Sequence, residues 1–438
     1  MSGQDYRARD LASVWHPYSR INELEAEEFP IIVRGDGVYL FDADGKRYID
    51  GISSWWACNL GHGHPRIVEA IKRQAVTLQH SMIGGMSHPS VIELAERLVD
   101  VCPDGLSKAF FASDGSSAVE AALKIAIQYW HNLGKPDKTR FASLQDGYHG
   151  DTLGAVSVGM VETFHKAYSP LLFPAFKAVS PYCRKCPEGK DAETCNIECF
   201  SSMEAILEEH SEQLAAIILE PLNQAAAGMR IYPSEYLAKL STACRKHNVL
   251  LIADEIAMGY GRSGRMFACN HADITPDILC LGKAMAAGYL PISATVVTQD
   301  IYDSFRDTEL QDRTFYHGHT FTGNPIACAA AVETLQVFDD ERIIASMAPS
   351  VAALGEGLRV LSEMPGVSGA RQIGMVGAVE MQKSRVANVC REARRRGVLL
   401  RPLGDVLYLW PPLTISQDQM RDLIGAVVEF IEVVSTTE

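Results

Sequence analysis

The stretch Leu250–Ile256 (LLIADEI), together with Cys280–Ala284 (CLGKA) further along the chain, decides the fold. In the first, an apolar run ends at Asp254. In the second, the apolar run Ile278–Leu281 is followed by a glycine and Lys283. Short apolar runs that end in a turn are typical of buried strands. We therefore expect two strands with Asp254 and Lys283 at their carboxyl ends, which is the edge where doubly wound sheets bind ligands.

Strand-like and helix-like segments alternate on both sides of this stretch. The predicted strands are Lys108–Ser113, Leu214–Leu219 and Val249–Ala253, and the predicted helices between them are Ala118–Tyr129 and Ser234–His247. Buried strands separated by helices of this length indicate a largely parallel sheet covered on both faces. The fold class predicted from this pattern is α/β, with the sheet sandwiched between helices.

The pattern changes in the last quarter of the chain. A long alanine-rich helix is expected at Ile326–Phe338, and short strands and helices of α+β character begin at about Gly366. We therefore predict three parts, which are an N-terminal segment that joins the small domain and the substrate pocket, a large domain and a C-terminal small domain. Their predicted bounds are 1–70, 71–330 and 331–438.

The composition excludes some classes of partner. The 438 residues are 47% apolar and 21% charged, and 54 acidic residues against 40 basic ones leave a net charge of −14. Nucleic acids and anionic membranes select for basic surfaces, so we expect neither as a partner. The N-terminus has no apolar run suited to a signal peptide, and eleven cysteines without one indicate a reducing compartment, so we predict a cytoplasmic protein.

Lys283 and Asp254 have side chains that suit covalent chemistry on an aldehyde. A lysine in an apolar setting has a lowered pKa, so its neutral amine can form a Schiff base. An aspartate that faces a pyridine nitrogen keeps this nitrogen protonated and makes the ring an electron sink. The alternative is that the two residues form an ordinary ion pair at a domain edge.

Two turns could contribute to the same site. Ser113–Ser117 (SDGSS) lies between a predicted strand and a predicted helix, where unpaired N–H groups favour an anion. The simpler interpretation is a helix N-cap. In Asp146–Thr152 (DGYHGDT), Tyr148 could stack on a cofactor ring, or it could pack locally as part of a surface turn.

Five motifs together resemble the class III, or ω-, aminotransferases over nearly the whole chain. They are DGYHGDT, EPLNQAAAGM (Glu220–Met229), ADEIAMGYGRSG (Ala253–Gly264), PDILCLGKAMAAG and FTGNPIACAAA. The resemblance implies pyridoxal-phosphate (PLP) fold type I, with PLP as cofactor. It also implies roles for six residues: Gly115 and Ser116 bind the phosphate, Tyr148 and Ile256 pack on the two ring faces, Asp254 meets the pyridine nitrogen and Lys283 holds the cofactor covalently.

The resemblance further implies an obligate homodimer with shared active sites. Thr320, just before the FTGNP motif, would reach the phosphate bound by the neighbouring subunit. His319 stands where familiar members carry proline, and we count it with Thr320 among the cofactor-binding residues.

Aromatic side chains gather near the N-terminus, in Trp15–Tyr18 (WHPY) and Ser53–Trp56 (SSWW), and an arginine, Arg401, precedes an apolar run near the C-terminus. Aromatic walls suit an aliphatic chain or an adenine ring, and an arginine can hold a carboxylate. A hydrophobic plug at a dimer interface and an ordinary surface arginine are the alternatives. The substrate-binding residues that we predict are Tyr18, Trp55, Trp56, Tyr148, Gly318, Arg401 and Tyr408.

These features resemble the family members that make 7,8-diaminononanoate in biotin biosynthesis. The resemblance implies a ping-pong transfer from S-adenosylmethionine to the keto acid 8-amino-7-oxononanoate. Lysine as the donor, or an ω-amino acid or diamine transferred to pyruvate, would be the nearest alternatives. A catalytically silent PLP-fold protein and an aminomutase or racemase are more distant ones.

Four cysteines lie in the hydrophilic insertion PYCRKCPEGKDAETCNIECF: Cys183, Cys186, Cys195 and Cys199. Four thiols in a short segment could hold zinc tetrahedrally, but the spacing is loose and no histidine joins them. We expect reduced thiols and predict no metal site.

Overall fold

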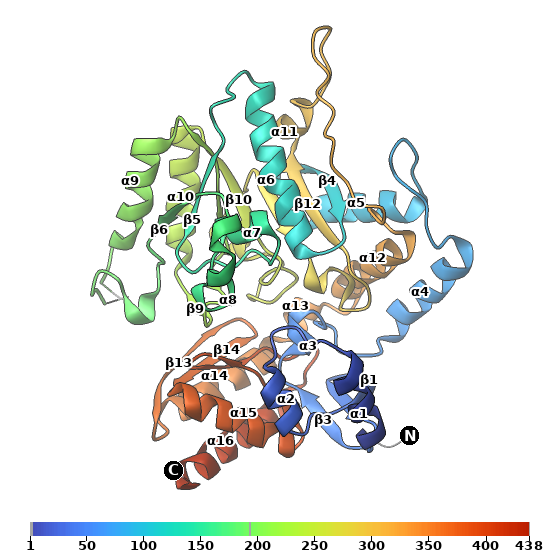
Figure 1. The fold of residues 1–438 in the computed structure, drawn as a ribbon, viewed down its shortest axis with the longest axis vertical. Coiled ribbons are helices and arrows are strands. Elements are labelled where there is room, and N and C mark those ends of the chain that lie inside the picture. The colour runs from blue at the N-terminus through green and yellow to red at the C-terminus, as the bar shows by residue number, and fades with distance from the viewer. Residues whose placement is uncertain (1–2, 192–193, 438) are drawn as a thin grey trace.

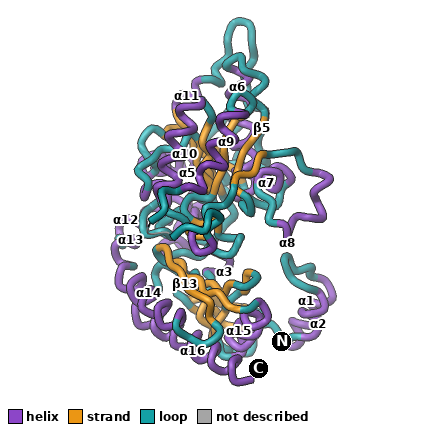
Figure 2. The backbone as a smooth tube through the Cα atoms, turned by 90° about the vertical axis from the view of Figure 1, so that its left-hand side faces the viewer, coloured by secondary structure: helices purple, strands orange, loops and turns teal. Residues whose placement is uncertain are grey.

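The computed structural model describes residues 3–191 and 194–437, which form an upper and a lower body (Figure 1). A seven-stranded sheet occupies the upper body, and two four-stranded sheets lie in the lower one. The first and last helices both lie in the lower body, although they are at opposite ends of the chain (Figure 1). Viewed from the side, the two bodies remain distinct, with α8 (Glu162–His165) facing the N-terminal helices (Figure 2).

The seven-stranded sheet is largely parallel, as the alternation of strands and helices predicts. Its strand order is β4 (Leu106–Ala112), β12 (Ser293–Thr298), β11 (Ile278–Leu281), β10 (Leu250–Asp254), β7 (Leu214–Leu219), β5 (Arg140–Leu144) and β6 (Phe176–Ala178). Strand β12 is antiparallel to β4 and β11, while the pairs among β11, β10, β7, β5 and β6 are parallel.

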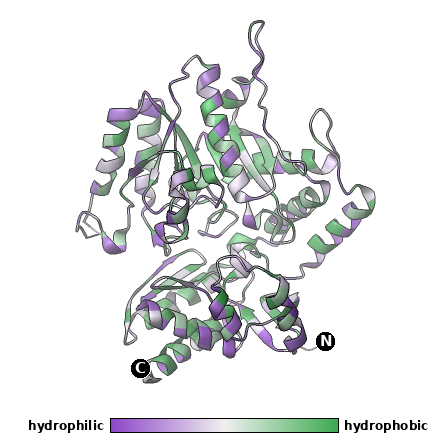
Figure 3. Cartoon of the chain, viewed as in Figure 1, coloured by the Kyte–Doolittle hydropathy of each residue, from purple (hydrophilic) through white to green (hydrophobic). Residues whose placement is uncertain are grey.

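Helices cover both faces of this sheet because its strands are apolar on both sides. In β10, Ile252 joins the buried cluster beneath α6 (Gly115–Asn132), whereas Leu251 and Ala253 join the cluster on the other face. The second cluster is completed by α5 (Pro89–Val101), α10 (Ser234–His247) and α12 (Pro325–Asp340). Successive side chains of a strand point to opposite faces, so a fully apolar strand needs a helix layer on each. In Figure 3 the strands of the upper body are mostly green, the colour of hydrophobic residues.

The lower body combines C-terminal and N-terminal strands. One antiparallel sheet has the order β13 (Val367–Ile373), β14 (Val376–Met381), β17 (Val406–Leu409) and β16 (Pro402–Leu403). The other has the order β1 (Ile32–Asp36), β2 (Tyr39–Asp42), β3 (Arg47–Asp50) and β15 (Val398–Leu399), and β15 runs parallel to β3. The pairing of β15 with β3 attaches the N-terminal strands to the C-terminal part of the chain. The division at residues 330 and 331 that we predict falls inside α12, which packs on α4 (Pro65–Thr77) and α5 of the upper body.

The remaining elements are short helices, the C-terminal helices and one small hairpin. They are α1 (Gly3–Ser13), α2 (Ile21–Ala26), α3 (Ser53–Trp56), α7 (Leu153–Val158), α9 (Ser201–His210), α11 (Gln299–Asp303), α13 (Ile343–Ser346), α14 (Ala348–Ser362), α15 (Lys383–Arg395), α16 (Gln417–Thr437), β8 (Asn223–Gln224) and β9 (Arg230–Ile231). One stretch, Ile343–Ser362, is long and apolar enough to cross a membrane by length and composition. It consists of α13 and α14, and α14 packs against β13 and α16.

Candidate active site

The predicted site residues follow the carboxyl ends of strands that are parallel in direction, so they share one edge of the sheet. Strand β4 leads into the Ser113–Ser117 turn, β5 into the turn with Tyr148, and β7 into Glu220. Asp254 is the last residue of β10, and Lys283 follows β11 by one glycine. These two turns and the residues Glu220, Asp254 and Lys283 are far apart in the sequence but lie at one edge of the sheet.

The strand register sets the relation between Asp254 and Lys283. Asp254 pairs with Cys280 across β10 and β11, so Lys283 follows just beyond the carboxyl end of the neighbouring strand. The Lys283 backbone has a φ of 42°, in the left-handed region that few residues with a Cβ adopt. Strained backbone of this kind often occurs at functional sites.

The amine of Lys283 is held in an apolar environment. Its Nζ atom lies 5.0 Å from the ring centroid of Trp56. Burial lowers the pKa of Lys283, and the carboxylates of Asp254 and Glu220 offset only part of this effect. Among the described residues Lys283 has no ion-pair partner within 4 Å, so the two residues do not form the ordinary ion pair that was the alternative interpretation. The environment of Lys283 instead favours a neutral, nucleophilic amine.

Asp254 is oriented by His149 rather than by the lysine. The Nδ1 atom of His149 lies 2.7 Å from Oδ2 of Asp254, and both side chains are buried. The backbone N–H of Ile256 donates to the other carboxylate oxygen, Oδ1, at 3.1 Å. The sequence places His149 beside Tyr148 but does not show this contact, because the pair joins the ends of two strands that are distant in the chain.

The turn before α6 combines a helix cap with an open N-terminus. Asp114 is the N-cap residue and accepts a hydrogen bond from the backbone N–H of Ser117 at 3.0 Å, so the cap interpretation is correct for Asp114. Gly115 and Ser116 are the first residues of α6, where N–H groups have no intrahelical acceptor and the helix dipole favours an anion. The cap and an anion site are therefore compatible.

Glycines allow three segments to meet at this turn. A Cβ atom on Gly115 would lie 2.9 Å from Cγ2 of Ile256, and a Cβ atom on Gly282 would lie 3.4 Å from Cα of Gly115. The turn Ser113–Ser117, which we call the phosphate turn after its predicted role, thus approaches the segment after Asp254 and the segment before Lys283 within contact distance. A cofactor with a phosphate, a pyridine nitrogen and an aldehyde would meet a suitable group at each point of this arrangement.

Tyr148 belongs to a network of polar groups rather than a simple surface turn. Its hydroxyl donates to Oδ2 of Asp151 at 3.0 Å, and the hydroxyl of Tyr18 donates to Oδ1 of the same carboxylate at 2.5 Å. The backbone N–H of Asp151 in turn donates to Oγ of Ser116 at 3.2 Å. Burial and the bond to Asp151 raise the pKa of Tyr18 to about 12. The network connects the N-terminal segment to the phosphate turn through Asp151, a residue to which no sequence motif gives a role.

The adjacent tryptophans have different environments. Trp55 is 40% exposed, with its ring 5.5 Å from that of Tyr18, and the guanidinium carbon of Arg401 lies 4.0 Å from the Trp55 ring centroid. Trp56 is buried, stacks on Trp410 at 4.9 Å and lies 6.0 Å from the ring of Tyr408, which is also buried. Ser54 and Trp55 have positive φ angles within α3, so the backbone is not a regular helix between the two tryptophans. Trp55, Tyr18 and Arg401 therefore form an accessible group, whereas Trp56 and Tyr408 lie in the core beside Lys283.

The segment with Gly318, His319 and Thr320 is less closely connected to the lysine. The Nδ1 atom of His319 lies 3.3 Å from Oγ of Ser113, at the phosphate turn of the same chain. Gly318 and Thr320 are exposed, and no atom lies within 4 Å of the position of a Cβ on Gly318. Their roles at a neighbouring subunit's site stay predictions.

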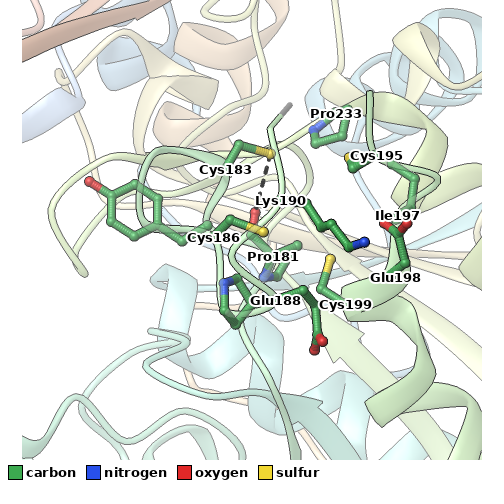
Figure 4. A pocket seen from close by; sticks show the side chains of 12 residues that line it. Pro181, Cys183, Cys186, Glu188, Lys190, Cys195, Ile197, Glu198, Cys199 and Pro233 are labelled. Carbon is green, nitrogen blue, oxygen red and sulfur yellow. Dashed lines mark hydrogen bonds between the residues drawn. The ribbon is translucent and has the colours of Figure 1, made fainter. Parts of the chain in front are cut away.

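The four cysteines of the insertion line one small cavity of about 20 Å³ (Figure 4). Burial raises the pKa of the Cys183 thiol, and it raises the pKa of the Cys199 thiol to about 11. Residues 192 and 193 of this insertion lie outside the described part, and within that part no three His, Cys, Asp or Glu side chains are placed to hold a metal ion. The environment favours protonated thiols at Cys183 and Cys199.

Comparison with known proteins identifies the family. The family model for aminotransferase class-III matches residues 22–431. The adenosylmethionine-8-amino-7-oxononanoate aminotransferase of Geobacter sulfurreducens is 42% identical over 99% of this chain and 98% of that protein. The crystal structure of the Methanocaldococcus jannaschii protein of the same name has a TM-score of 0.93 at 37% identity, covering 98% of this chain and 99% of that one. An (S)-enantioselective ω-transaminase from Thermomicrobium roseum has a TM-score of 0.94 at 32% identity, covering 99% of each chain. The chain therefore belongs to the class-III aminotransferases and is a PLP-dependent transaminase of fold type I.

Proposed function

We propose that the protein transfers an amino group from S-adenosylmethionine to 8-amino-7-oxononanoate and so makes 7,8-diaminononanoate in biotin biosynthesis. The names of several relatives that match over nearly their full length support this reaction. The observation that carries the proposal is the group formed by Arg401, Trp55 and Tyr18. It offers a cation for a carboxylate and aromatic faces for an adenine ring or an aliphatic chain.

The acceptor carboxylate would be held by Arg401. The guanidinium lies over Trp55 and 5.8 Å from the ring centroid of Tyr18, and it makes no ion pair among the described residues. An arginine that stacks on aromatic rings keeps its donors at the edge of the guanidinium plane, where a carboxylate can accept two of them. The neighbouring tryptophan and tyrosine would contact the chain of the acceptor and the adenine of the donor.

The cofactor would be held by the residues that meet at the sheet edge. The N-terminus of α6 at Gly115 and Ser116 would bind the phosphate, and Asp254 would keep a proton on the ring nitrogen with the help of His149. Ile256 and Tyr148 would pack on opposite faces of the ring. When bound, PLP supplies the electron sink for the amino transfer.

Lys283 would both hold the cofactor and move the proton. Its lowered pKa makes the neutral amine available to bond to the cofactor aldehyde. Once a donor amine has taken its place, the Lys283 amine would be the base that takes a proton from the carbon bearing the donor's amino group. Because one bound cofactor would carry the amino group from donor to acceptor, the kinetics would be ping-pong.

We also propose that the protein is a cytoplasmic homodimer with shared active sites. Gly318 and Thr320 are exposed in a single chain, as expected for residues that reach a neighbouring subunit. His319 already contacts the phosphate turn of its own chain through Ser113 and would lie close to such an interface. Sedimentation of the purified protein at micromolar concentration would test this proposal, and a monomer that is fully active would contradict it.

A half-reaction screen tests the substrates. The holoenzyme is mixed in turn with S-adenosylmethionine, lysine, β-alanine and putrescine, and the loss of visible cofactor absorbance is followed. We expect S-adenosylmethionine to bleach the cofactor at the lowest concentration, and subsequent 8-amino-7-oxononanoate to restore the colour with release of 7,8-diaminononanoate. Bleaching by lysine alone would point to a lysine-dependent version of the reaction. Bleaching by β-alanine or putrescine with recovery by pyruvate would point to an ω-amino acid or diamine transaminase.

The variant Arg401→Lys separates the two substrates. A lysine retains the charge but loses the planar pair of donors, so we expect a higher KM for 8-amino-7-oxononanoate, by about 10-fold or more. The rate of bleaching by S-adenosylmethionine should change less. An unchanged KM for the acceptor would remove Arg401 from the carboxylate site.

A further inference from the structure

The short helix α8 (Glu162–His165) lies behind the two tyrosines of the proposed substrate pocket. Its last two residues contact both of them: Phe164 meets the ring of Tyr18 edge-on at 5.3 Å, and the ring of His165 lies parallel to that of Tyr148 at 5.9 Å. We infer that His165, supported by Phe164, is a positioning residue that acts through Asp151 to orient Tyr18 and Tyr148 toward the amino donor. This inference deepens the proposed function and rests on it.

The hydrogen bonds of His165 define the position of its ring proton. The backbone N–H of Val161 donates to Nδ1 of His165 at 3.1 Å, so this nitrogen is an acceptor in the structure. The proton of the neutral ring is therefore on Nε2, which lies 3.2 Å from Oδ1 of Asp151 and can donate to it. The imidazole is buried, with both nitrogens in hydrogen bonds, so it has one well-defined orientation.

Asp151 is the link between His165 and the tyrosines. Its Oδ1 atom accepts from Tyr18 and His165, and its Oδ2 atom accepts from Tyr148. Burial alone would raise the pKa of Asp151, but the hydrogen bonds from His165, Tyr18 and Tyr148 outweigh it and lower the pKa. The carboxylate is consequently ionised at neutral pH and takes one hydrogen from each of three donors.

The network determines what the phenols can offer a substrate. Because the hydroxyl hydrogens of Tyr18 and Tyr148 point to Asp151, each oxygen turns its lone pairs away from the carboxylate. A phenol in this state accepts a hydrogen bond from an N–H group, such as those on an amine or an adenine amino group. Without the bond from His165, Asp151 would lose one of the contacts that hold its carboxylate group in the plane that serves both tyrosines.

Other charged groups face this network from neighbouring elements. The charge of Asp151 raises the pKa of Lys283, although less than burial lowers it. The guanidinium of Arg401 lies on the ring of Tyr18, 5.8 Å from its centroid. Of these two groups, the guanidinium of Arg401 keeps its charge at any working pH and favours an ionised Asp151. His165 donates to Asp151, so its removal takes away one of the hydrogen bonds that lower the pKa of the carboxylate.

Two substitutions separate the hydrogen bond of His165 from its packing. The variant His165→Phe retains a flat ring against Tyr148 but cannot donate to Asp151, whereas His165→Gln retains an N–H donor and loses the ring. A matched control is His210→Phe on α9, because His210 also stacks on an aromatic ring, that of Phe176 at 4.1 Å, far from the proposed site. All variants are prepared as holoenzymes with saturating PLP.

We expect His165→Phe to raise the KM for the amino donor by about 10-fold or more, with a smaller change in kcat, because it removes a hydrogen bond to a charged carboxylate. The KM for the acceptor should change less than that for the donor. His165→Gln should restore the donor KM to within about 3-fold of the original value. His210→Phe should leave both values unchanged.

The pH dependence provides a second readout. Loss of the bond from His165 removes a contribution that lowers the pKa of Asp151. In His165→Phe the acid limb of kcat/KM for the donor should therefore move to higher pH, and in His165→Gln it should return. The melting temperature and the PLP affinity of the apoenzyme should stay close to those of the original protein, because Nε2 of His165 bonds to Asp151 rather than to the phosphate turn.

The outcomes separate this inference from the proposed function. If the original protein fails to use S-adenosylmethionine, the substrate proposal fails, and the variants are compared by cofactor bleaching with whichever amine the protein accepts. An unchanged donor KM and an unchanged acid limb in His165→Phe would overturn the positioning role. The role would also be overturned if His165→Gln were as impaired as His165→Phe, or if both variants lost PLP affinity and melting temperature together, since these results would indicate packing alone.

Discussion

At the scale of single residues, the chemistry depends on the balance of forces on one amine. Burial lowers the pKa of Lys283 because a charged ammonium is poorly solvated there, while the carboxylates of Asp254 and Glu220 raise it. The first effect is the larger, so the amine loses its proton more easily than a lysine in water. Burial also raises the pKa of Glu220 to about 8, which weakens its contribution as a charged neighbour.

Replacing Lys283 by alanine removes the amine that we propose holds the cofactor. We expect Lys283→Ala to lose the visible absorbance of the lysine-bound cofactor and to lose turnover by about 10²–10⁴-fold or more, since a positioned base typically contributes this much. Absorbance spectra of the purified variant with added PLP, together with a steady-state assay, measure both effects. A fully active variant would end the assignment of Lys283.

Replacing Asp254 by asparagine tests the role of its charge. The shape of the side chain and the contact with His149 are largely retained, but a neutral amide cannot keep a proton on the ring nitrogen. We expect Asp254→Asn to retain PLP and to lose about 100-fold or more in kcat. Asp300→Asn, on the first turn of α11, is a suitable control because the same change is made away from the site. Equal rates for Asp254→Asn and the original protein would contradict the proposed pairing.

At the scale of elements, three segments of the chain pack together at the N-terminus of α6. Gly115 is required there because a Cβ atom would lie 2.9 Å from Ile256 Cγ2, closer than real Cβ contacts. Asp114 caps the helix without using the N–H groups of Gly115 and Ser116. The same turn can therefore stabilise the helix and bind an anion.

This crowding predicts a pair of compensating substitutions. Gly115→Ala should push Ile256 and the helix N-terminus apart and weaken PLP binding by the apoenzyme, by about 10-fold. Adding Ile256→Val removes a methyl group from the crowded contact and should recover part of the affinity. Gly425→Ala on α16, where nothing lies within 4 Å of the new Cβ, is the control. Fluorescence titration with PLP gives the affinities, and an unaltered affinity in Gly115→Ala would argue against a phosphate site at this turn.

At the scale of the whole molecule, the proposed active site needs both bodies. Lys283 and Asp254 belong to the upper sheet, whereas Tyr18, Trp55 and Arg401 come from the N-terminal and C-terminal parts of the chain (Figure 1). The bodies are joined by polar contacts as well as by the core. Glu380 on β14 accepts hydrogen bonds from Tyr182 at 3.0 Å and Arg184 at 2.7 Å and pairs with Lys185 at 2.9 Å, all in the cysteine-containing insertion.

The pairing of Glu380 predicts a pH-dependent contribution to stability. Burial alone would raise its pKa, but the hydrogen bonds from Lys185, Arg184 and Tyr182 outweigh this and bring it from 4.5 to about 2. A carboxyl group with a depressed pKa in the folded state stabilises the protein fully above its unfolded value, and this stabilisation is lost as the pH falls through the folded value. The contact is therefore complete at pH 7 and weakens between about pH 4.5 and 2.

We expect Glu380→Gln to lower the free energy of unfolding by about 1–3 kcal/mol at neutral pH, because a bond to a charged group is lost in a buried position. The difference from the original protein should decrease as the pH is lowered below about 4.5. Urea unfolding at several pH values measures it. A difference that stays constant down to pH 3 would show that the charge of Glu380 is not responsible.

Local patterns were sufficient for the four apolar strands β4, β7, β10 and β11, for several helices, and for the positions of Asp254, Lys283 and the turn before α6. Apolar runs predict buried strands wherever they occur, and residues after parallel strands must gather at one edge because the strands share one direction. For this reason Asp254, Lys283 and the turn before α6 could be expected at one edge, whereas the cofactor roles given to Tyr148 and Ile256 follow from the family resemblance and stay predictions. This expectation does not depend on how many strands separate these residues in the sheet, or on the antiparallel direction of β12.

Contacts between distant segments could be decided only by the folded chain. Nothing in the local pattern indicates that His149 contacts Asp254, that Asp151 is shared by two tyrosines and His165, or that Trp55 is accessible while Trp56 is buried. Each of these depends on how one segment packs on another, and a polar side chain finds its partner only after the strands and turns have fixed their separation. The order of apolar and polar residues therefore set the fold and the edge that carries the chemistry, whereas packing between segments set the orientation of the groups that would bind and discriminate substrates.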